Sequence, residues 1–364
     1  PSLNLSNNQT NPEPFPFATW SKLLRQVLNN HQTELMQASP SQGLWELRQA
    51  IAQHLNDYRG MVVDPRQIVI GAGTEYLYTL LIQLLGLDKT VAVEEPSYPK
   101  ITKIYRQFNI TQVPIAMEKD GLSVAQLQKS KADMVHLSPS HQFPTGAILS
   151  VSKRYDLLSW ASQGDRYIIE DDYDSEFRFQ GLPIPSLQEI DCSGRVIYIN
   201  TFSKSLASTL RMSYMILPPQ LLEVFEKKLS FYANTVSNLE QYTLAAFIQE
   251  GYFDKHLNRM RLFYQKKRDE LITCLKASPL KDYISIHEQE SGLHFIMTID
   301  SHLSEDAICQ KSRQKGLQLT PISHYYQHHT PQSTNAFIVN YANITAPQIE
   351  QIVQMLTEIL LLES

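Results

Sequence analysis

Lys204 stands among residue types that together could capture a carbonyl compound beside a phosphate group. It ends the segment Asn200-Thr201-Phe202-Ser203-Lys204, directly after an apolar run, and Arg211 follows seven residues later. A lysine amine forms a Schiff base with a carbonyl compound, and hydroxyl groups with a guanidinium hold phosphate oxygens. A single lysine is usually a solvated surface residue. The combination of residues is what favours Schiff-base chemistry.

Three other short segments of polar or small residues also follow apolar runs. Gly71-Ala72-Gly73-Thr74-Glu75 opens a helical pattern, where free N–H groups suit a phosphate, although tight turns use glycine for steric reasons alone. Glu170-Asp171-Asp172-Tyr173-Asp174 is a candidate functional cluster, with an acidic surface loop or a helix N-cap as the alternative. No histidine lies nearby in the sequence, so we predict no metal site. The third segment, Ser138 to Gly146, predicts a turn.

A mostly parallel sheet would bring these four segments together. Short β-branched runs alternate with helical segments at Ile68–Ile70, Val91–Val93, Met134–Leu137, Tyr167–Ile169, Val196–Ile199 and Tyr214–Leu217. Continuously apolar strands that alternate with helices predict a sheet covered on both faces. Ligands of such sheets bind beyond the carboxyl ends of the strands, which is where the four segments lie.

The flanking sequences predict an arm and a second domain. Residues 1–16 are rich in Asn, Pro and Ser and have no apolar period, which is typical of a linker or flexible arm. Residues 17–45 form an N-terminal segment that we expect to pack on the small domain. Residues 46–245 would form the large domain, and residues 246–364 a smaller α+β domain of alternating strand-like and helical runs.

Composition excludes several classes of function. The 364 residues are 43% hydrophobic, which is enough for more than one core. A net charge of -5 argues against a broad surface for nucleic acid, so these residues alone should bind DNA poorly. The three cysteines show no metal-like spacing, as expected in a reducing compartment. We find no membrane-length apolar run and no signal pattern, and expect a cytoplasmic protein.

Four strings together resemble a known family, the fold-type I proteins that bind pyridoxal 5'-phosphate (PLP). Within it they resemble the MocR/GabR group, whose aminotransferase-like domain is the effector domain of a transcription regulator. The resemblance covers nearly the whole chain and implies a large domain with a mostly parallel, seven-stranded sheet and a smaller α+β C-terminal domain. The strings are Gly43-Leu44-Trp45-Glu46-Leu47-Arg48, Pro139-Ser140-His141-Gln142-Phe143-Pro144-Thr145-Gly146, Glu170-Asp171-Asp172-Tyr173-Asp174-Ser175-Glu176-Phe177-Arg178 and Thr201-Phe202-Ser203-Lys204-Ser205-Leu206.

The resemblance implies a role for each residue of the PLP site. Lys204 would form the Schiff base, and Asp171 would pair with the pyridine nitrogen and keep it protonated, so that the ring can accept electrons. Tyr173 would donate to the phenolic oxygen of the ring. Tyr98 would stack on the ring, although a packed loop aromatic is almost as good an interpretation. The phosphate would be surrounded by Gly73, Thr74, Thr201, Ser203 and Arg211.

The chain departs from ordinary aminotransferases at three positions. Phe143 replaces the asparagine that binds the phenolic oxygen, which leaves this task to Tyr173 or His141. No tyrosine occurs near Ala38, where one would reach the phosphate of a neighbouring subunit. Ile338 stands in place of the arginine that clamps a substrate carboxylate, and no arginine follows Arg313. Since such an anchor is worth about 1.5–3 kcal/mol per charged hydrogen bond, ordinary α-amino acids should bind poorly.

The leading hypothesis is therefore a ligand-sensing and oligomerising module of a MocR-type regulator. Its signal would be PLP itself, as in a PdxR-like subgroup, or an amino compound bound as an external aldimine, with His324, Tyr325 and Tyr326 as candidate effector-binding residues. A winged-helix DNA-binding domain would lie upstream, and the resemblance implies a homodimer. The rival is a free-standing aminotransferase. We expect regulation with at most weak transaminase activity, and we disfavour a structural dimer that binds no cofactor.

Overall fold

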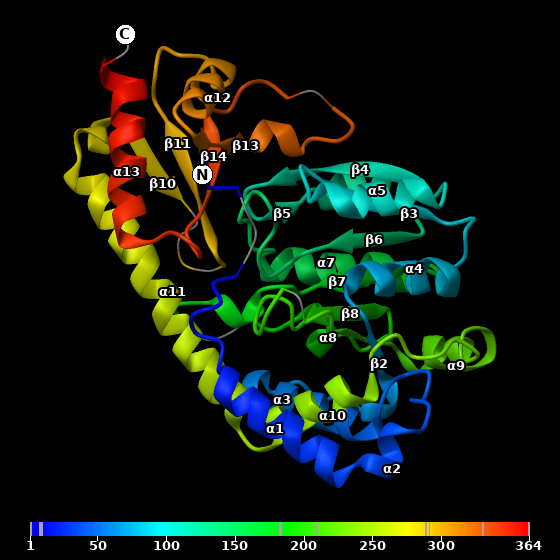
Figure 1. Ribbon diagram of the computed structural model, residues 1–364. Coiled ribbons are helices and arrows are strands. Elements are labelled where there is room, and N and C mark those ends of the chain that lie inside the picture. Colours follow the sequence, from blue (N-terminus) through cyan, green and yellow to red (C-terminus); the bar gives the residue numbers. More distant parts are fainter. Residues whose placement is uncertain are drawn as a thin grey trace.

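An eight-stranded sheet forms the centre of the protein (Figure 1). The computed structural model describes residues 2–6, 10–181, 184–208, 210–287, 290, 292–329 and 331–362. In spatial order the strands are β2 (Ile68–Gly71), β9 (Ser213–Ile216), β8 (Val196–Thr201), β7 (Tyr167–Asp171), β6 (Met134–Leu137), β3 (Thr90–Glu95), β4 (Thr111–Glu118) and β5 (Gly121–Leu122). Six of the eight strands run in the same direction, and only β9 and β5 run in the opposite direction. The prediction of a mostly parallel sheet is confirmed.

The predicted six strand runs are all present, and two further strands were missed. Strand β4 contains Pro114 and has a mixed pattern of exposure, which a sequence search for continuously apolar runs does not recognise. Strand β5 has two residues and closes the sheet at its edge beside β4. The sheet therefore has one strand more than the seven that the resemblance implied.

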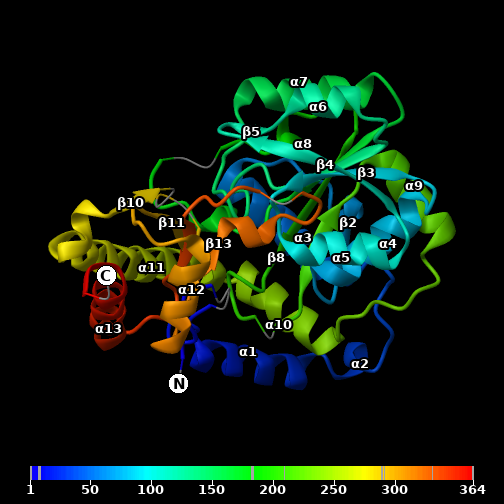
Figure 2. The same cartoon turned by 90° about the horizontal axis from the view of Figure 1, so that it is seen from above.

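Successive residues of the central strands pack on opposite faces of the sheet. Ile169 of β7 packs under α4 (Thr74–Leu85), α5 (Pro99–Gln107) and α9 (Pro219–Lys228), whereas Ile168 packs against α6 (Val124–Lys129), α7 (Val151–Ser162) and α8 (Leu187–Ile190). Figure 2 shows α6 and α7 on one side of the sheet and α4 and α5 on the other. This double cover explains why the strands are apolar along their whole length.

The first helices pack on the large sheet, which corrects the prediction that residues 17–45 pack on the small domain. Leu23 and Val27 of α1 (Phe17–Asn30) lie in one apolar cluster with Ile68 and Ile70 of β2. The short helix α2 (Gln32–Leu35) follows, and α3 (Trp45–Arg59) and α10 (Asn238–Gln249) complete this layer. An apolar stripe on a helix identifies a buried face but does not identify the partner, which is why the sequence misled us.

The smaller domain is a four-stranded antiparallel sheet with helices on it. Its strands are β10 (Ile284–His287), β11 (His294–Ile299), β14 (Ala336–Asn340) and β13 (Thr320–Pro321). Helices α12 (Glu305–Gln314) and α13 (Ala346–Thr357) cover it, and α11 (Tyr252–Ala277) runs from α1 and α10 to this domain (Figure 1). Leu257 of α11 belongs to the cluster of the large domain and Leu271 to that of the small domain, so one helix joins both cores.

Residues Leu3, Asn4, Leu5 and Asn11 of the N-terminal arm contact the small domain, whereas the sequence predicted a linker or flexible arm. Strand β1 (Leu3–Asn4) pairs in parallel with β12 (Leu317–Gln318). The main-chain N–H of Asn340 donates to the Leu5 carbonyl at 2.6 Å, and the Leu5 side chain is 1% exposed. Further along, Asn11 donates to the Ala342 carbonyl. A two-residue strand among polar residues has no period that a sequence pattern could detect.

No helix in the described ranges has both the length and the apolar composition needed to cross a bilayer.

Truncating Leu5 tests whether the arm stabilises the small domain. Leu5→Ala should lower the free energy of unfolding by about 2–5 kcal/mol, because it removes a fully buried side chain from a packed core. Val62→Ala, at a residue that is 85% exposed, is the matched control and should change little. Urea unfolding followed by circular dichroism measures both. Equal stability of the two variants would mean that the arm is not anchored in solution.

Candidate cofactor and ligand site

A cavity lies at the carboxyl edge of the large sheet, where the predicted residues converge. Its lining includes eight of the ten residues predicted to bind the cofactor, namely Thr74, Tyr98, Asp171, Tyr173, Thr201, Ser203, Lys204 and Arg211. Because β3, β6, β7 and β8 are parallel, the residues that follow them meet at one edge. The prediction of one shared site depended on this parallel arrangement of the strands.

Lys204 is a half-buried amine with a lowered proton affinity. Burial is the main cause that lowers its pKa, to about 8, while the negative charge of Asp174 acts in the opposite direction and Lys100 adds to the lowering. At neutral pH a tenth or so of such an amine is uncharged, far more than for an ordinary lysine. Only the uncharged amine is a nucleophile, so the site prepares Lys204 to react with an aldehyde.

Asp171 ends β7 and accepts two hydrogen bonds from buried side chains. Its Oδ2 accepts a short hydrogen bond from the hydroxyl group of Tyr78 and a second from Nε2 of His136 at 3.0 Å. Asp171 is 4% exposed and lines the cavity. A carboxylate at this place suits a protonated ring nitrogen, as predicted for the cofactor.

The phosphate end of the cavity is built around Arg211 and Gly73. Gly73 begins α4 with φ +93°, and a Cβ atom there would come within 2.6 Å of Nη2 of Arg211. Only glycine allows this approach, which places the guanidinium beside the helix N-terminus. Glu75 pairs with Lys100 at 2.7 Å and lies 3.7 Å from Arg211. The cationic and N–H donors present fit the phosphate of PLP.

Tyr173 and His141 are held on a neighbouring network. The Tyr173 hydroxyl group donates to the main-chain carbonyl of His141 at 3.0 Å, and Nδ1 of His141 lies 2.8 Å from Oδ2 of Asp174. His141 lines a separate small cavity with Arg59 and Ser140. Of the two predicted ligands for the phenolic oxygen, Tyr173 is therefore the one on the wall of the main cavity.

Aromatic side chains from both domains meet above the cavity. Phe143 contacts Tyr98 at 5.9 Å between ring centroids, Tyr325 at 5.1 Å and His294 of β11 at 5.3 Å. Burial lowers the pKa of His294 to about 3, so it is neutral. Of the predicted effector-binding residues, Tyr325 reaches this aromatic group, whereas Tyr326 packs with Ile296 and Ile322, and none of His324, Tyr325 and Tyr326 is in the cavity lining.

Glu95 ties the small domain to the edge of the cavity. Its Oε1 accepts hydrogen bonds from the main-chain N–H groups of Gln327 at 2.7 Å and His328 at 2.5 Å. Its Oε2 lies 2.6 Å from Nδ1 of His329. Burial opposes the charge on Glu95, yet the hydrogen bonds from His329 and from the main chain lower its pKa overall. The carboxylate therefore holds the loop after the 3-10 turn Ile322–Tyr325.

Ile338, which replaces the expected arginine, is an ordinary core residue. It lies in the middle of β14, opposite Ile296 and Thr320, and is 1% exposed. Within the described part of the chain, the only arginine that lines the cavity is Arg211, at the phosphate end. A ligand carboxylate thus has no guanidinium partner on the small-domain side.

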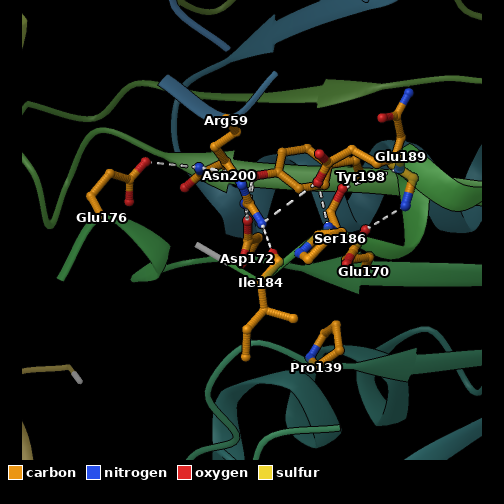
Figure 3. A network of polar contacts seen from close by, with 12 residues as sticks. Arg59, Pro139, Glu170, Asp172, Glu176, Ile184, Ser186, Glu189, Tyr198 and Asn200 are labelled. Carbon is orange, nitrogen blue, oxygen red and sulfur yellow. Dashed lines mark hydrogen bonds and ion pairs between the residues drawn. The ribbon is translucent and has the colours of Figure 1, made fainter. Parts of the chain in front are cut away.

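A buried polar network surrounds Asp172, the residue between Asp171 and Tyr173 in the sequence (Figure 3). Arg59 forms a short ion pair with Asp172 and donates to the Ile184 carbonyl at 2.8 Å, and Tyr198 also donates to Asp172. Burial opposes ionisation of Asp172, but Arg59 and Tyr198 lower its pKa overall. The carboxylate of nearby Glu170 accepts hydrogen bonds from two main-chain N–H groups at the start of α8. Burial raises the pKa of Glu170 to about 7.

Sequence analysis missed several residues of this site. Tyr78, Glu94, Ser97 and Lys100 also line the cavity, as do Glu75 and Phe143, which the sequence analysis had named without assigning them a role in binding the cofactor. Tyr78 lies one helical turn after Thr74, so the helical period already placed it on the face that carries the phosphate residues. His136 and Arg59 carried no such signal, because their partners are distant in sequence.

Comparisons with known proteins agree with the fold. A family model described as aminotransferase class I and II matches residues 2–356. The chain is 37% identical to the HTH-type transcriptional regulator YdeL of Bacillus subtilis, over 93% of this chain and 72% of YdeL. It is 33% identical to the probable rhizopine catabolism regulatory protein MocR of Rhizobium meliloti, over 91% of this chain and 66% of MocR. A multiple substrate aminotransferase from Thermococcus profundus superimposes with a TM-score of 0.85 at 25% identity, covering 99% and 91% of the two chains.

Replacing Arg59 tests the buried network. Arg59→Met should lower the free energy of unfolding by about 3–5 kcal/mol, because Asp172 stays buried without its partner. Arg66→Met is the matched control, since Arg66 pairs with Asp64 at the surface and such pairs contribute about 0–1 kcal/mol. Urea denaturation measures both. A loss for Arg59→Met as small as that of the control would contradict the structural role of this pair.

Proposed function

Because the chain belongs to the aminotransferase class I and II family, and within it to the MocR-type transcription regulators, we propose that it is the ligand-sensing module of such a regulator. Its cofactor is pyridoxal 5'-phosphate. The module would also mediate homodimer formation. The relatives extend beyond the matched region, as YdeL does by more than a quarter of its length, and a helix-turn-helix DNA-binding domain would lie there.

One observation carries this proposal: the cavity holds the main residues expected to bind the cofactor, whereas the arginine expected to bind a substrate carboxylate is replaced by Ile338. Lys204, Asp171 and Arg211 are all in the lining. On the opposite side, Ile338 is buried in β14 where a carboxylate-binding arginine was expected. Without a guanidinium, an ordinary amino acid loses about 1.5–3 kcal/mol for each charged hydrogen bond. Binding without efficient turnover is what a sensor needs.

When bound, PLP supplies an aldehyde for a Schiff base and an electron-accepting ring. The residues of this chain orient it. Lys204 provides the amine, Asp171 provides a carboxylate for the ring nitrogen, and Tyr98 and Phe143 provide aromatic surface above the cavity. Arg211 and the N-terminus of α4 bind the phosphate. The aromatic group and Glu95 connect this site to the small domain.

The signal would be PLP itself, in a PdxR-like manner, or an amino compound that competes with Lys204 for the aldehyde. The missing carboxylate anchor favours PLP. His324, Tyr325 and Tyr326 remain our candidates for contacts to an amino compound, and Tyr325 is the best placed because its ring contacts Phe143. A free-standing aminotransferase is the second candidate, which the likeness to solved aminotransferases favours.

An absorbance titration distinguishes these functions. Wild-type protein with PLP should show a band at ~420 nm from the Schiff base on Lys204, and Lys204→Ala should lack it. Lys103→Ala, at an exposed lysine of α5, is the control and should keep the band. The amines to test are D-alanine, D-alanyl-D-alanine and γ-aminobutyrate.

A band that none of these amines shifts supports PLP as the signal, and a shift with one amine identifies the class of effector. Turnover with a keto acid as acceptor would instead favour the aminotransferase. No band in the wild type would refute the proposed PLP site on Lys204.

The lowered pKa of Lys204 predicts how PLP capture depends on pH. The rate constant should rise about tenfold per pH unit below about 8 and level off above it, because only the uncharged amine reacts. A lysine of ordinary pKa would give rates that still rise at pH 9 and above. Stopped-flow absorbance measures the rates. A continued rise to pH ~10 would show that burial does not lower the proton affinity of Lys204 in solution.

A further inference from the structure

Two side chains that no predicted role explains donate to the same oxygen of Asp171. The Tyr78 hydroxyl group donates to Oδ2 from α4, and Nε2 of His136 lies 3.0 Å from Oδ2 on the side of β6. The Tyr78 and His136 rings pack edge to face, 5.0 Å apart. No hydrogen bond reaches Oδ1 from any residue that the structure describes. One oxygen of the carboxylate is thus fully engaged by the protein, and the other is left for a ligand.

A third residue extends this set of hydrogen bonds beyond His136. The Tyr105 hydroxyl group of α5 lies 2.8 Å from Nδ1 of His136. Burial, followed by the charge of Asp171, raises the pKa of Tyr105 well above its ordinary value, so the phenol keeps its proton. A neutral imidazole donates with one nitrogen and accepts with the other. Nε2 must donate to the carboxylate, so Nδ1 accepts from Tyr105, and the bonds run from Tyr105 through His136 to Asp171.

We propose that Tyr78 and the Tyr105–His136 pair are positioning residues, which hold Oδ2 of Asp171 so that Oδ1 meets the ring nitrogen of the cofactor and the shared proton stays on that nitrogen. This inference rests on the proposed PLP site. Hydrogen bonds to a carboxylate favour its ionised form. With two donors on Oδ2, the carboxylate competes less well for the proton, which remains on the ring and maintains its capacity to accept electrons.

The other ionisable groups around Asp171 do not oppose this arrangement. Glu94 of β3 lines the same cavity, and burial, together with the charge of Asp171, raises its pKa to about 8, so it is mostly uncharged at neutral pH. Burial also raises the pKa of Tyr173, which follows β7, well above its ordinary value. Asp171 is thus the main negative charge available to a protonated ring nitrogen at this place.

The first experiment reads the ring nitrogen directly. PLP labelled with ¹⁵N in the ring, bound to the wild type at pH 7, should give the NMR shift of a protonated pyridine. In Tyr78→Phe the ratio of protonated to neutral nitrogen should fall about tenfold or more, the effect of losing one charged hydrogen bond. Tyr105→Phe should change the ratio in the same direction but less, because it acts through His136.

Tyr76→Phe is the matched control, because Tyr76 lies on the same helix outside the cavity lining, and it should keep the wild-type shift. An unchanged shift in folded Tyr78→Phe would overturn the proposal. Circular dichroism identifies variants that fail to fold. Loss of folding alone would not make the ratio of protonated to neutral nitrogen fall less in Tyr105→Phe than in Tyr78→Phe.

The second experiment needs no cofactor and separates this inference from the proposed function. In the unliganded wild type, ¹⁵N–¹H NMR should show His136 with its proton on Nε2 and an unprotonated Nδ1. A proton on Nδ1 would reverse the direction of the hydrogen bonds and overturn the proposal. If PLP does not bind the wild type at all, the proposed function fails, but the state of His136 still decides whether the protein orients Asp171 as inferred.

Discussion

The ion pair of Arg59 with Asp172 is the constraint on which the rest of the site depends. Both side chains are buried; Tyr198 also donates to Asp172, and Arg59 also donates to the Ile184 carbonyl (Figure 3). Asp172 follows Asp171 directly and precedes Tyr173, and these two neighbours line the cavity. By fixing Asp172 on one side of the chain, the ion pair fixes the direction in which Asp171 and Tyr173 point. A buried charge without its partner would be costly, so the segment has few alternative conformations.

The site is shared between two domains through a small number of contacts. Glu95 holds the loop at 327–329 of the small domain, and Tyr325 and His294 reach Phe143. On the opposite side, Nε2 of His256 of α11 donates to the Ser205 carbonyl at 2.6 Å, next to Lys204, and its ring lies 6.3 Å from Phe15 of the arm. The segment that carries Lys204 is thus linked through α11 to the arm and to both domains.

The asymmetry of the cavity is consistent with sensing. Cations and N–H donors gather at the phosphate end, and the carboxyl groups of Asp171 and Glu94 lie at the ring end, whereas the wall toward the small domain is aromatic. Aromatic surface binds a ligand by stacking and burial and tolerates different shapes, while a guanidinium selects a carboxylate. Among the described residues, the cavity lining has an amine, a carboxylate and one guanidinium, and no second guanidinium that would suit the carboxylate of an amino acid.

The sequence by itself determined the elements of the large sheet and the residues at their carboxyl ends. Apolar runs identified six strands, and parallel strands must bring Lys204 and Asp171 to one edge, so the main residues of the site could be predicted. Arg211 lies at the same edge because it precedes β9, which runs antiparallel. Local periodicity does not specify partners far along the chain. Only tertiary packing decided that Leu5 anchors the arm, that α1 covers the large sheet, and that His141 faces a separate cavity. The same holds for Tyr78 and His136, because a buried hydrogen bond between distant elements depends on how helices and strands pack.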